Sequence, residues 1–303
     1  LLSPRDKFTS SVFALLLCCP SRISEILALP ADCEITQKDE KGIERYGLRF
    51  YSVKGYGPNI KRIPQVMIPV AKKAISRLLS LSQNARAFSQ WCEKYPDKFY
   101  QHELCPKVDE TSKLTVTQVC HALGYPLHDH KSCVLKIKKT SLDGGKSFLN
   151  PNDYTYSLSE LWEMIISGFS RDFPWYDEEK SIRFSNALCL LNPRQFTLSQ
   201  MIDIYLFHKP TKGFFFNDIQ NKKRHEHGSK NNFARHRYYD IECEPLLIRS
   251  HQPRPLLNTI SHSGEMSALD LATWFGRVHV NQNRVANHVS EEDMLDKIKT
   301  IKL

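Results

Sequence analysis

Two short segments of this sequence carry an arginine together with a second ionisable side chain, and arginine is a residue type that can bind a phosphate. The segment at 21–29 (SRISEILAL) carries Arg22 three residues before Glu25, and the segment at 250–259 (SHQPRPLLNT) carries His251 three residues before Arg254. Guanidinium groups stay ionised at any working pH, and their planar forks can hold two oxygens of a phosphate at once. An imidazole adds one more donor. These residue types therefore allow a phosphate group to be bound and negative charge on it to be stabilised.

A third candidate lies in a predicted β-hairpin. Residues 47–53 (GLRFYSV) and 61–70 (KRIPQVMIPV) have the composition of strands and flank a turn-rich link at 55–59. Lys54 stands at the tip, where its amine could donate a proton. Taken alone, such a lysine is an ordinary solvated side chain, and an arginine three residues from a glutamate is a weak surface ion pair. Only the combination of segments, in order, supports a functional argument.

The elements that must position these residues are indicated by helix caps and helix breakers. Ser3 predicts the start of a helix that Pro20 ends, and a second short helix follows over 21–29 and ends at Pro30. Periodicity and caps predict further helices over 71–79, 114–123, 157–169, 252–262, 267–276 and 280–289, with an amphipathic tail from Ser290.

We therefore predict a mainly helical α+β fold with a small β-hairpin or sheet and a long insertion. Residues 1–90 and 241–303 form the two parts of one domain, and 91–240 is an insertion of unknown fold. Within it, the lysine- and arginine-rich stretch 222–239 is expected to be exposed, either as a solvated loop or as an arm that contacts phosphates.

Composition and charge limit the function further. The chain has 303 residues, 41% of them hydrophobic and 25% charged, which is enough for a buried core and excludes general disorder. A net charge of +9 favours an anionic partner. The longest apolar run, 12–19, is far shorter than the ~18–20 residues of a membrane span. Nine cysteines at irregular spacings favour reduced thiols in a cytoplasmic setting.

In their order along the chain, these segments resemble the tyrosine recombinases, or phage-type integrases. SRISEILAL resembles the first box of that family, and the hairpin resembles the strand pair that presents its catalytic lysine. The H-x-x-R segment resembles the second box, and 274–290 (WFGRVHVNQNRVANHVS) is similar to the closing box. The resemblance covers roughly 5–90 and 245–290. It implies that Arg22, Lys54, His251 and Arg254 are catalytic and that Glu25 orients them.

The closing box departs from the family pattern at its most important position. Ala286, two residues before the supporting His288, stands where the family has its nucleophilic tyrosine. Arg277 stands where the family usually has histidine or tryptophan, and it matches a catalytic donor position. The chain is therefore expected to bind its DNA site without forming a covalent intermediate. Ala286 is either an engineered substitution or a natural change in a degenerate member; the retention of the other catalytic residues favours the first.

The resemblance also implies a mechanism and partners. A tyrosine attacks the phosphorus of a DNA strand, leaving a 3′-phosphotyrosine bond and a free 5′-hydroxyl, with Lys54 as the general acid. No metal or other cofactor takes part. The expected partners are double-stranded DNA and further copies of the chain or related recombinases, in a tetramer joined by exchange of the C-terminal tail. The expected location is the bacterial cytoplasm or nucleoid.

The basic residues expected to contact DNA lie in the hairpin and in the basic stretch. They are Lys61, Arg62, Lys222, Lys223, Arg224, Lys230, Arg235 and Arg237. Two alternatives stay open: a non-catalytic DNA-binding regulator derived from the same fold, and a nucleic-acid-binding protein without strand transfer, which charge alone supports. Histidines and cysteines within 102–133 match no zinc-ligand spacing, which favours buried thiols and surface histidines.

Overall fold

The described part of the chain divides into two compact units. The computed structural model describes residues 2–38, 42–51, 58–139, 141–143, 146–147, 155–197, 200–220, 231–249, 251–263 and 274–275. The first unit comprises Leu1–Leu78 and Thr211–Leu303, and the second comprises Leu79–Pro210. These boundaries differ from the predicted insertion at 91–240. The first boundary falls within one helix, α3 (Ile68–Lys94), which the sequence pattern delimited only over 71–79.

The first unit begins with the two predicted helices. In α1 (Pro4–Cys18), Ser3 is the N-cap: its hydroxyl accepts from the Asp6 backbone N–H at 3.1 Å, and Asp6 accepts from the Ser3 N–H in return. This capping box confirms the predicted start. The short helix α2 (Ile23–Leu27) follows Pro20, and buried side chains of α1 such as Phe8, Val12 and Leu15 form part of the core.

The predicted hairpin is part of a three-stranded antiparallel sheet. Its strands are β1 (Glu34–Lys38), β2 (Glu44–Tyr51) and β3 (Pro58–Arg62), in that order, and Lys61 pairs with Leu48. The strand predicted over 61–70 was wrong beyond Arg62, because a 3₁₀ turn at Gln65–Met67 leads directly into α3. Proline has no N–H for a strand ladder, so Pro64 ends the pairing, and Pro69 is compatible with the first turn of a helix.

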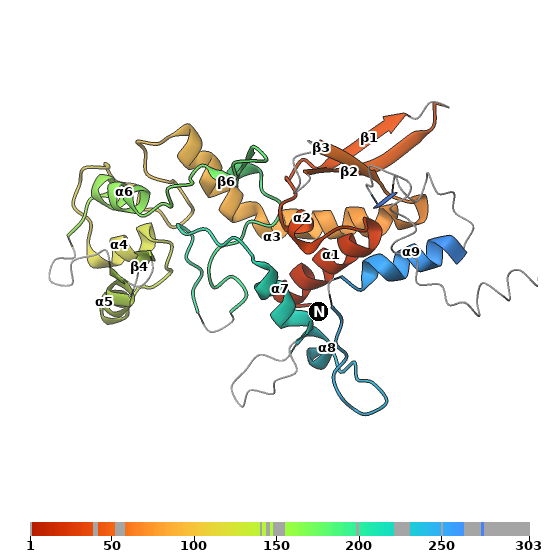
Figure 1. Cartoon of the computed structure of the whole chain (residues 1–303). Helices are drawn as coiled ribbons and strands as arrows, with labels where there is room; N and C mark the ends of the chain where they lie inside the picture. The colour runs from red at the N-terminus through yellow and green to blue at the C-terminus, as the bar shows by residue number, and fades with distance from the viewer. Residues whose placement is uncertain are drawn as a thin grey trace, which may run out of the picture. The chain divides into compact units, whose positions relative to one another are not determined.

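The C-terminal part of the first unit contains α7 (Lys212–Ile219), α8 (Asn232–Arg235) and α9 (Pro253–Ser263). Of these, α9 confirms the helix predicted over 252–262, whereas α7 and α8 lay within the predicted insertion. In Figure 1, α1 lies beside both α7 and α9, in agreement with the residue contacts between these helices. Segments from the two ends of the chain therefore build one unit.

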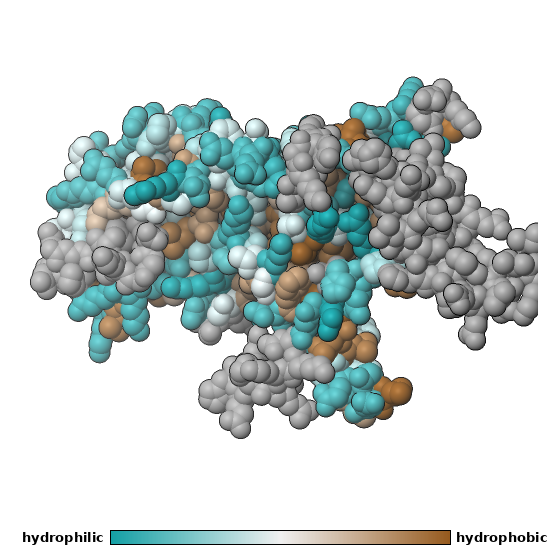
Figure 2. All heavy atoms as spheres, viewed as in Figure 1, coloured by the Kyte–Doolittle hydropathy of each residue, from teal (hydrophilic) through white to brown (hydrophobic). Residues whose placement is uncertain are grey.

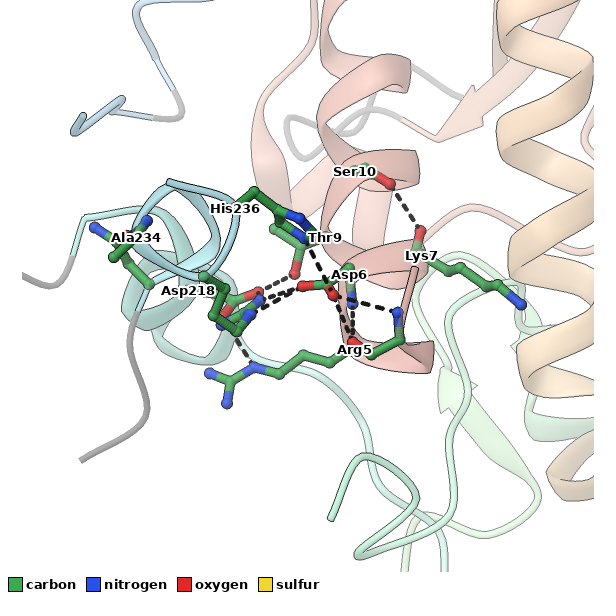
Figure 3. A network of polar contacts seen from close by, with 11 residues as sticks. Arg5, Asp6, Lys7, Thr9, Ser10, Asp218, Ala234 and His236 are labelled. Atoms are coloured by element: carbon green, nitrogen blue, oxygen red, sulfur yellow. Dashed lines mark hydrogen bonds and ion pairs between the residues drawn. The ribbon is translucent and has the colours of Figure 1, made fainter. Parts of the chain in front are cut away.

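A buried ion network joins α1 to α7 and α8 (Figure 3). The Arg235 guanidinium donates to both Asp218 oxygens at 2.6 and 2.9 Å, and to one Asp6 oxygen at 2.7 and 2.9 Å. Arg5 lies 2.9 Å from Asp218, and the Thr9 hydroxyl donates to the same carboxylate. The prediction that Arg235 contacts DNA is therefore wrong, because its donors are directed at two buried carboxylates.

The second unit is built from short elements around an aromatic core. Its helices after α3 are α4 (Val116–Ala122), α5 (His130–Lys139) and α6 (Leu158–Ser167), and its strand pairs are β4 (Ser141–Asp143) with β5 (Lys146–Ser147) and β6 (Trp175–Asp177) with β7 (Ile182–Arg183). Phe88 packs against Tyr100, Trp162, Tyr205 and other rings at centroid distances of 5.1–6.3 Å. The helices predicted over 114–123 and 157–169 are confirmed as α4 and α6.

The fold is α+β, as the sequence predicts. Helices predominate in the described residues, and every sheet among them is small and antiparallel. Within that part of the chain, no helix combines the length and the apolar character that a bilayer crossing requires.

Loss of Arg235 is expected to destabilise the first unit. Arg235→Met leaves Asp6 and Asp218 buried with fewer cations, and breaking such a pair costs about 3 kcal/mol of the free energy of unfolding. Arg237→Met is the matched control, because Arg237 is exposed two residues further along. Urea unfolding of both variants measures the difference, and an equal effect of the two substitutions contradicts the importance of the network.

The same network predicts a stability loss in acid. Burial raises the pKa of Asp6, but the hydrogen bonds from Ser3 and Arg235 together outweigh burial and lower the pKa from 3.8 to about 2. A carboxyl group whose pKa is lower in the folded than in the unfolded state stabilises the fold when the pH is above its unfolded-state pKa. That stabilisation is lost as the pH falls from 3.8 towards 2. We expect the free energy of unfolding to fall less over this interval in the Asp6→Asn variant than in the parent chain. Equal slopes for the two proteins would show that Asp6 is not responsible.

Candidate anion site

Arg22 and Glu25 lie at the start of α2 and face different surroundings. Arg22 is the N-cap residue with extended backbone angles, and its N–H donates to a Glu25 oxygen at 3.1 Å. Its guanidinium lies 3.5 Å from the other oxygen of the same carboxylate. The Arg22 side chain is 55% exposed, whereas that of Glu25 is 9% exposed. The arginine therefore reaches solvent while the carboxylate that orients it is buried.

Lys61 holds Glu25 from the opposite side. It lies in β3 opposite Leu48, so both side chains share the buried face of the sheet, and Lys61 is 5% exposed. Its ammonium donates to a Glu25 oxygen at 3.0 Å and to the Ser21 hydroxyl at 2.8 Å, and it lies 4.4 Å from the Phe50 ring centroid. The prediction that Lys61 contacts DNA was therefore wrong, because the amine is buried and paired.

Arg254, in the C-terminal part of the chain, lies near Arg22, Glu25 and Lys61. It stands in the first turn of α9, and its guanidinium carbon lies 5.8 Å from the Phe275 ring centroid. Burial lowers the pKa of Arg254, the Glu25 carboxylate opposes that change, and the Arg22 charge adds to it. Arg254 also acts on Lys61, whose pKa its charge lowers. Contacts join Arg22 and Lys61 to Glu25, and Arg254 lies near enough for its charge to act on all three; we refer to these four residues as the charge cluster.

The aromatic residues beside Arg254 fasten this region to α1. The Trp274 indole N–H donates to the Cys18 carbonyl at 2.9 Å, and Trp274 and Phe275 pack with Leu257 of α9 and with Leu17 and Met67. The chain segment at 274–275 thus closes over the junction between α1 and α9. Arg254 is held against it by its contact with Phe275.

The cluster carries a surplus of positive charge. Burial raises the pKa of Glu25, but the Lys61 and Arg22 contacts outweigh it and keep the pKa below its ordinary value, so the group is ionised at neutral pH. Three cations then face one carboxylate, which leaves two positive charges in excess. Among the described residues, no other carboxylate lies within salt-bridge distance of Arg22 or Arg254. Such an arrangement favours a bound anion, which two guanidinium forks can hold through several oxygens.

The other predicted site residues either lie apart from the charge cluster or fall outside the described part of the chain. His251 precedes α9 and is exposed, and the described residues record no contact between it and the charge cluster. Among the predicted DNA contacts, Arg62 and Arg237 are exposed as expected. The predicted residues that lie outside the described part of the chain are Lys54, Arg277, Ala286, His288, Lys222, Lys223, Arg224 and Lys230.

The loop that follows the predicted basic stretch 222–239 is acidic. The loop after α8 carries Asp240, Glu242 and Glu244, and the Asp240 carboxylate accepts the backbone N–H groups of the other two at 2.9 Å. Apolar side chains are exposed on the same loop, among them the fully exposed Ile241, and brown surface is visible in this region in Figure 2. Acidic side chains repel phosphates, so the loop does not extend the predicted DNA contact surface.

The cysteines and histidines of the second unit have mainly structural surroundings. Cys105, Cys120 and Cys133 are buried free thiols, as predicted. His102 is not a surface residue: it is half-buried, and its Nε2 lies 2.9 Å from the Ala122 carbonyl oxygen. Within the described residues, no three His, Cys, Asp or Glu side chains are grouped so that they could hold a metal ion.

Sequence reasoning missed the part that Lys61 and Ser21 take in the cluster. The pairing of Lys61 with the buried Leu48 places it on the inner face of the sheet, and this register is set by tertiary structure rather than by a local sequence signal. Comparison with protein-family models, curated proteins and solved structures found no match to this chain.

The charge cluster is expected to bind a small tetrahedral dianion. Sulfate is a suitable probe because it resembles a phosphate group and keeps its charge across neutral and alkaline pH. We expect one sulfate per chain by equilibrium dialysis of labelled sulfate at constant ionic strength, with about tenfold weaker binding after Arg22→Ala or Arg254→Ala. Lys73→Ala, which removes an exposed lysine of α3, is the control. Binding that is indifferent to both arginines would exclude this site.

Proposed function

We propose that this chain is the catalytic domain of a tyrosine-recombinase-like DNA strand transferase in which Ala286 takes the place of the nucleophile. The observation that carries the proposal is that α9, which holds Arg254, packs on α1, which leads directly into the Arg22 segment, so that the two arginines lie near enough for their charges to act on each other. Of the motifs that resemble the recombinase boxes, the segments that carry Arg22 and Arg254 belong to the same unit of the fold, which supports the proposal.

The geometry of the charge cluster suits the chemistry of strand transfer. Attack on a phosphodiester creates a pentavalent phosphorus whose non-bridging oxygens gain negative charge. The exposed Arg22 fork and the half-buried Arg254 fork supply fixed positive charge for those oxygens. Glu25 orients Arg22 through the helix cap and does not itself react. Lys54 remains the candidate for protonating the leaving 5′-oxygen, and His251 and Arg277 remain candidates for further donors.

Ala286 defines what the chain can do with DNA as it stands. A methyl group cannot attack phosphorus, so the protein binds a duplex and leaves it intact. The proposed partners are double-stranded DNA and further copies of the recombinase, with the tail from Ser290 exchanged between protomers. No metal is needed, because the guanidinium groups meet the charge of the transition state.

Restoring the nucleophile tests the proposed activity. Ala286→Tyr is expected to form a covalent protein–DNA adduct with members of a random-sequence duplex library, recovered after denaturing washes and released by protease. Adding Arg22→Ala or Arg254→Ala to this variant is expected to lower adduct yield by about 10²-fold or more, because each removes a donor to the transition state. Adding Lys73→Ala is the matched control and should leave the yield unchanged.

The outcome also separates the alternatives. A non-catalytic regulator, in which Ala286 would be the native residue, would select particular duplexes from the library and yield no adduct even with tyrosine at 286. A protein that binds nucleic acid through charge alone would show steep salt dependence and the same affinity after combined loss of Arg22, Lys54 and Arg254. Either result would contradict strand transfer.

A further inference from the structure

We propose that Lys61 is a positioning residue of the anion site: by neutralising Glu25 from inside the fold, it leaves the charges of Arg22 and Arg254 available to a phosphate. This inference rests on the proposed function and deepens it, because it explains how a site that contains a buried carboxylate can still attract an anion. The two Glu25 oxygens and their contacts with Lys61 and Arg22 carry the argument.

Glu25 presents its two oxygens to different partners. One oxygen accepts both the Lys61 ammonium at 3.0 Å and the Arg22 backbone N–H at 3.1 Å, while the other lies 3.5 Å from the Arg22 guanidinium. The closer cation is therefore the lysine, and the contact to the guanidinium is the longer one. The carboxylate is satisfied mainly by a group that cannot reach an external ligand, which leaves the arginine fork turned towards solvent.

The Lys61 amine is buried and does not extend into solvent. Its side chain is 6% exposed, and its donors are directed at Glu25 and at the Ser21 hydroxyl, with the Phe50 ring at 4.4 Å. A direct contact between this amine and a DNA phosphate would require the hydrogen bonds to Glu25 and Ser21 to break. Lys61 consequently acts through Glu25 rather than on the ligand.

Removal of Lys61 changes the charge that the anion meets. In Lys61→Met, the Glu25 carboxylate has only Arg22 and Arg254 to neutralise it, so the surplus of the cluster falls from two positive charges to one. In the double variant Lys61→Met/Glu25→Gln, the carboxylate is replaced by a neutral amide and the surplus of two returns. That amide retains an oxygen that can accept the Arg22 N–H. The double variant therefore separates an electrostatic role from a purely structural one.

The experiment is equilibrium dialysis of labelled sulfate against the full chain at constant ionic strength. We expect sulfate to bind about tenfold more weakly to Lys61→Met, and the double variant to return to within about threefold of the parent, because one unit charge at this range is worth that factor. Lys73→Met is the matched control for loss of an exposed lysine in the same unit. Circular dichroism and urea unfolding establish that each variant is folded.

The pH dependence supplies a second readout that a structural role would not move. Burial lowers the pKa of Lys61 from 10.5, Glu25 opposes the change, and the Arg254 charge adds to it. Cys19, the remaining titratable group that acts on Lys61, has a pKa raised well above its usual value by burial, so it stays a neutral thiol at mildly alkaline pH. Sulfate binding to the parent should therefore weaken as Lys61 loses its proton below pH 10.5, and the double variant should lack this step.

The sulfate-binding results can overturn the proposed role of Lys61 in two ways. Parent-like binding by Lys61→Met overturns the inference, as does a folded double variant that binds as weakly as the single variant. If Lys61→Met does not fold, the inference still requires that the double variant bind like the parent at neutral pH and lack its alkaline step. The proposed function fails separately, when the sulfate results hold but Ala286→Tyr forms no adduct with DNA.

Discussion

The buried pair of Lys61 and Glu25 is the interaction on which the rest of the anion site depends. Two charges removed from water are tolerated only when each meets a partner and its remaining donors or acceptors are satisfied. Here the lysine finds Glu25 and the Ser21 hydroxyl, and the carboxylate finds the lysine and the backbone of Arg22. Since these groups come from β3 and from the start of α2, the sheet and the helix are fixed together. The position of the Arg22 fork follows from that junction.

The second ion network solves a related problem at the other end of α1. The chain returns to the first unit after 79–210, and α7 and α8 must then pack on a helix that the first residues of the chain form. Asp6, Asp218 and Arg235 provide directional contacts for that packing, each with buried or half-buried partners. Hydrophobic contacts alone would tolerate sliding of one helix along another, whereas a fork between two carboxylates does not. Arg254 reaches its place in α9 from this anchored segment.

Local signals in the sequence predicted much of the helical structure. Ser3 and Ser157 satisfy the first N–H groups of α1 and α6 within a few residues, so the caps that indicate these helices also form them. Predictions about the sheet were wrong for another reason: the strand over 61–70 was too long, β1 was missed, and Lys61 was expected to be exposed. Pairing in a sheet depends on distant residues, and only the register opposite Leu48 decides that Lys61 points inward. Composition indicates that a lysine is exposed, and tertiary structure overrides it.

The roles of these residues change how the alanine at 286 is interpreted. Retention of Arg22, Lys54, His251 and Arg254 favours an engineered substitution only to the extent that the fold does not itself need these residues, because a residue that the fold needs is retained whether or not DNA is cut. Glu25 and Lys61 belong to that class, because removing either one leaves the other a buried charge without its closest ionic partner. Arg22 and Arg254 do not: one is largely exposed, and the charges of the two repel each other through a half-buried site. A bound anion would relieve that repulsion, so it is this pair, rather than the whole set, that supports the proposed anion site.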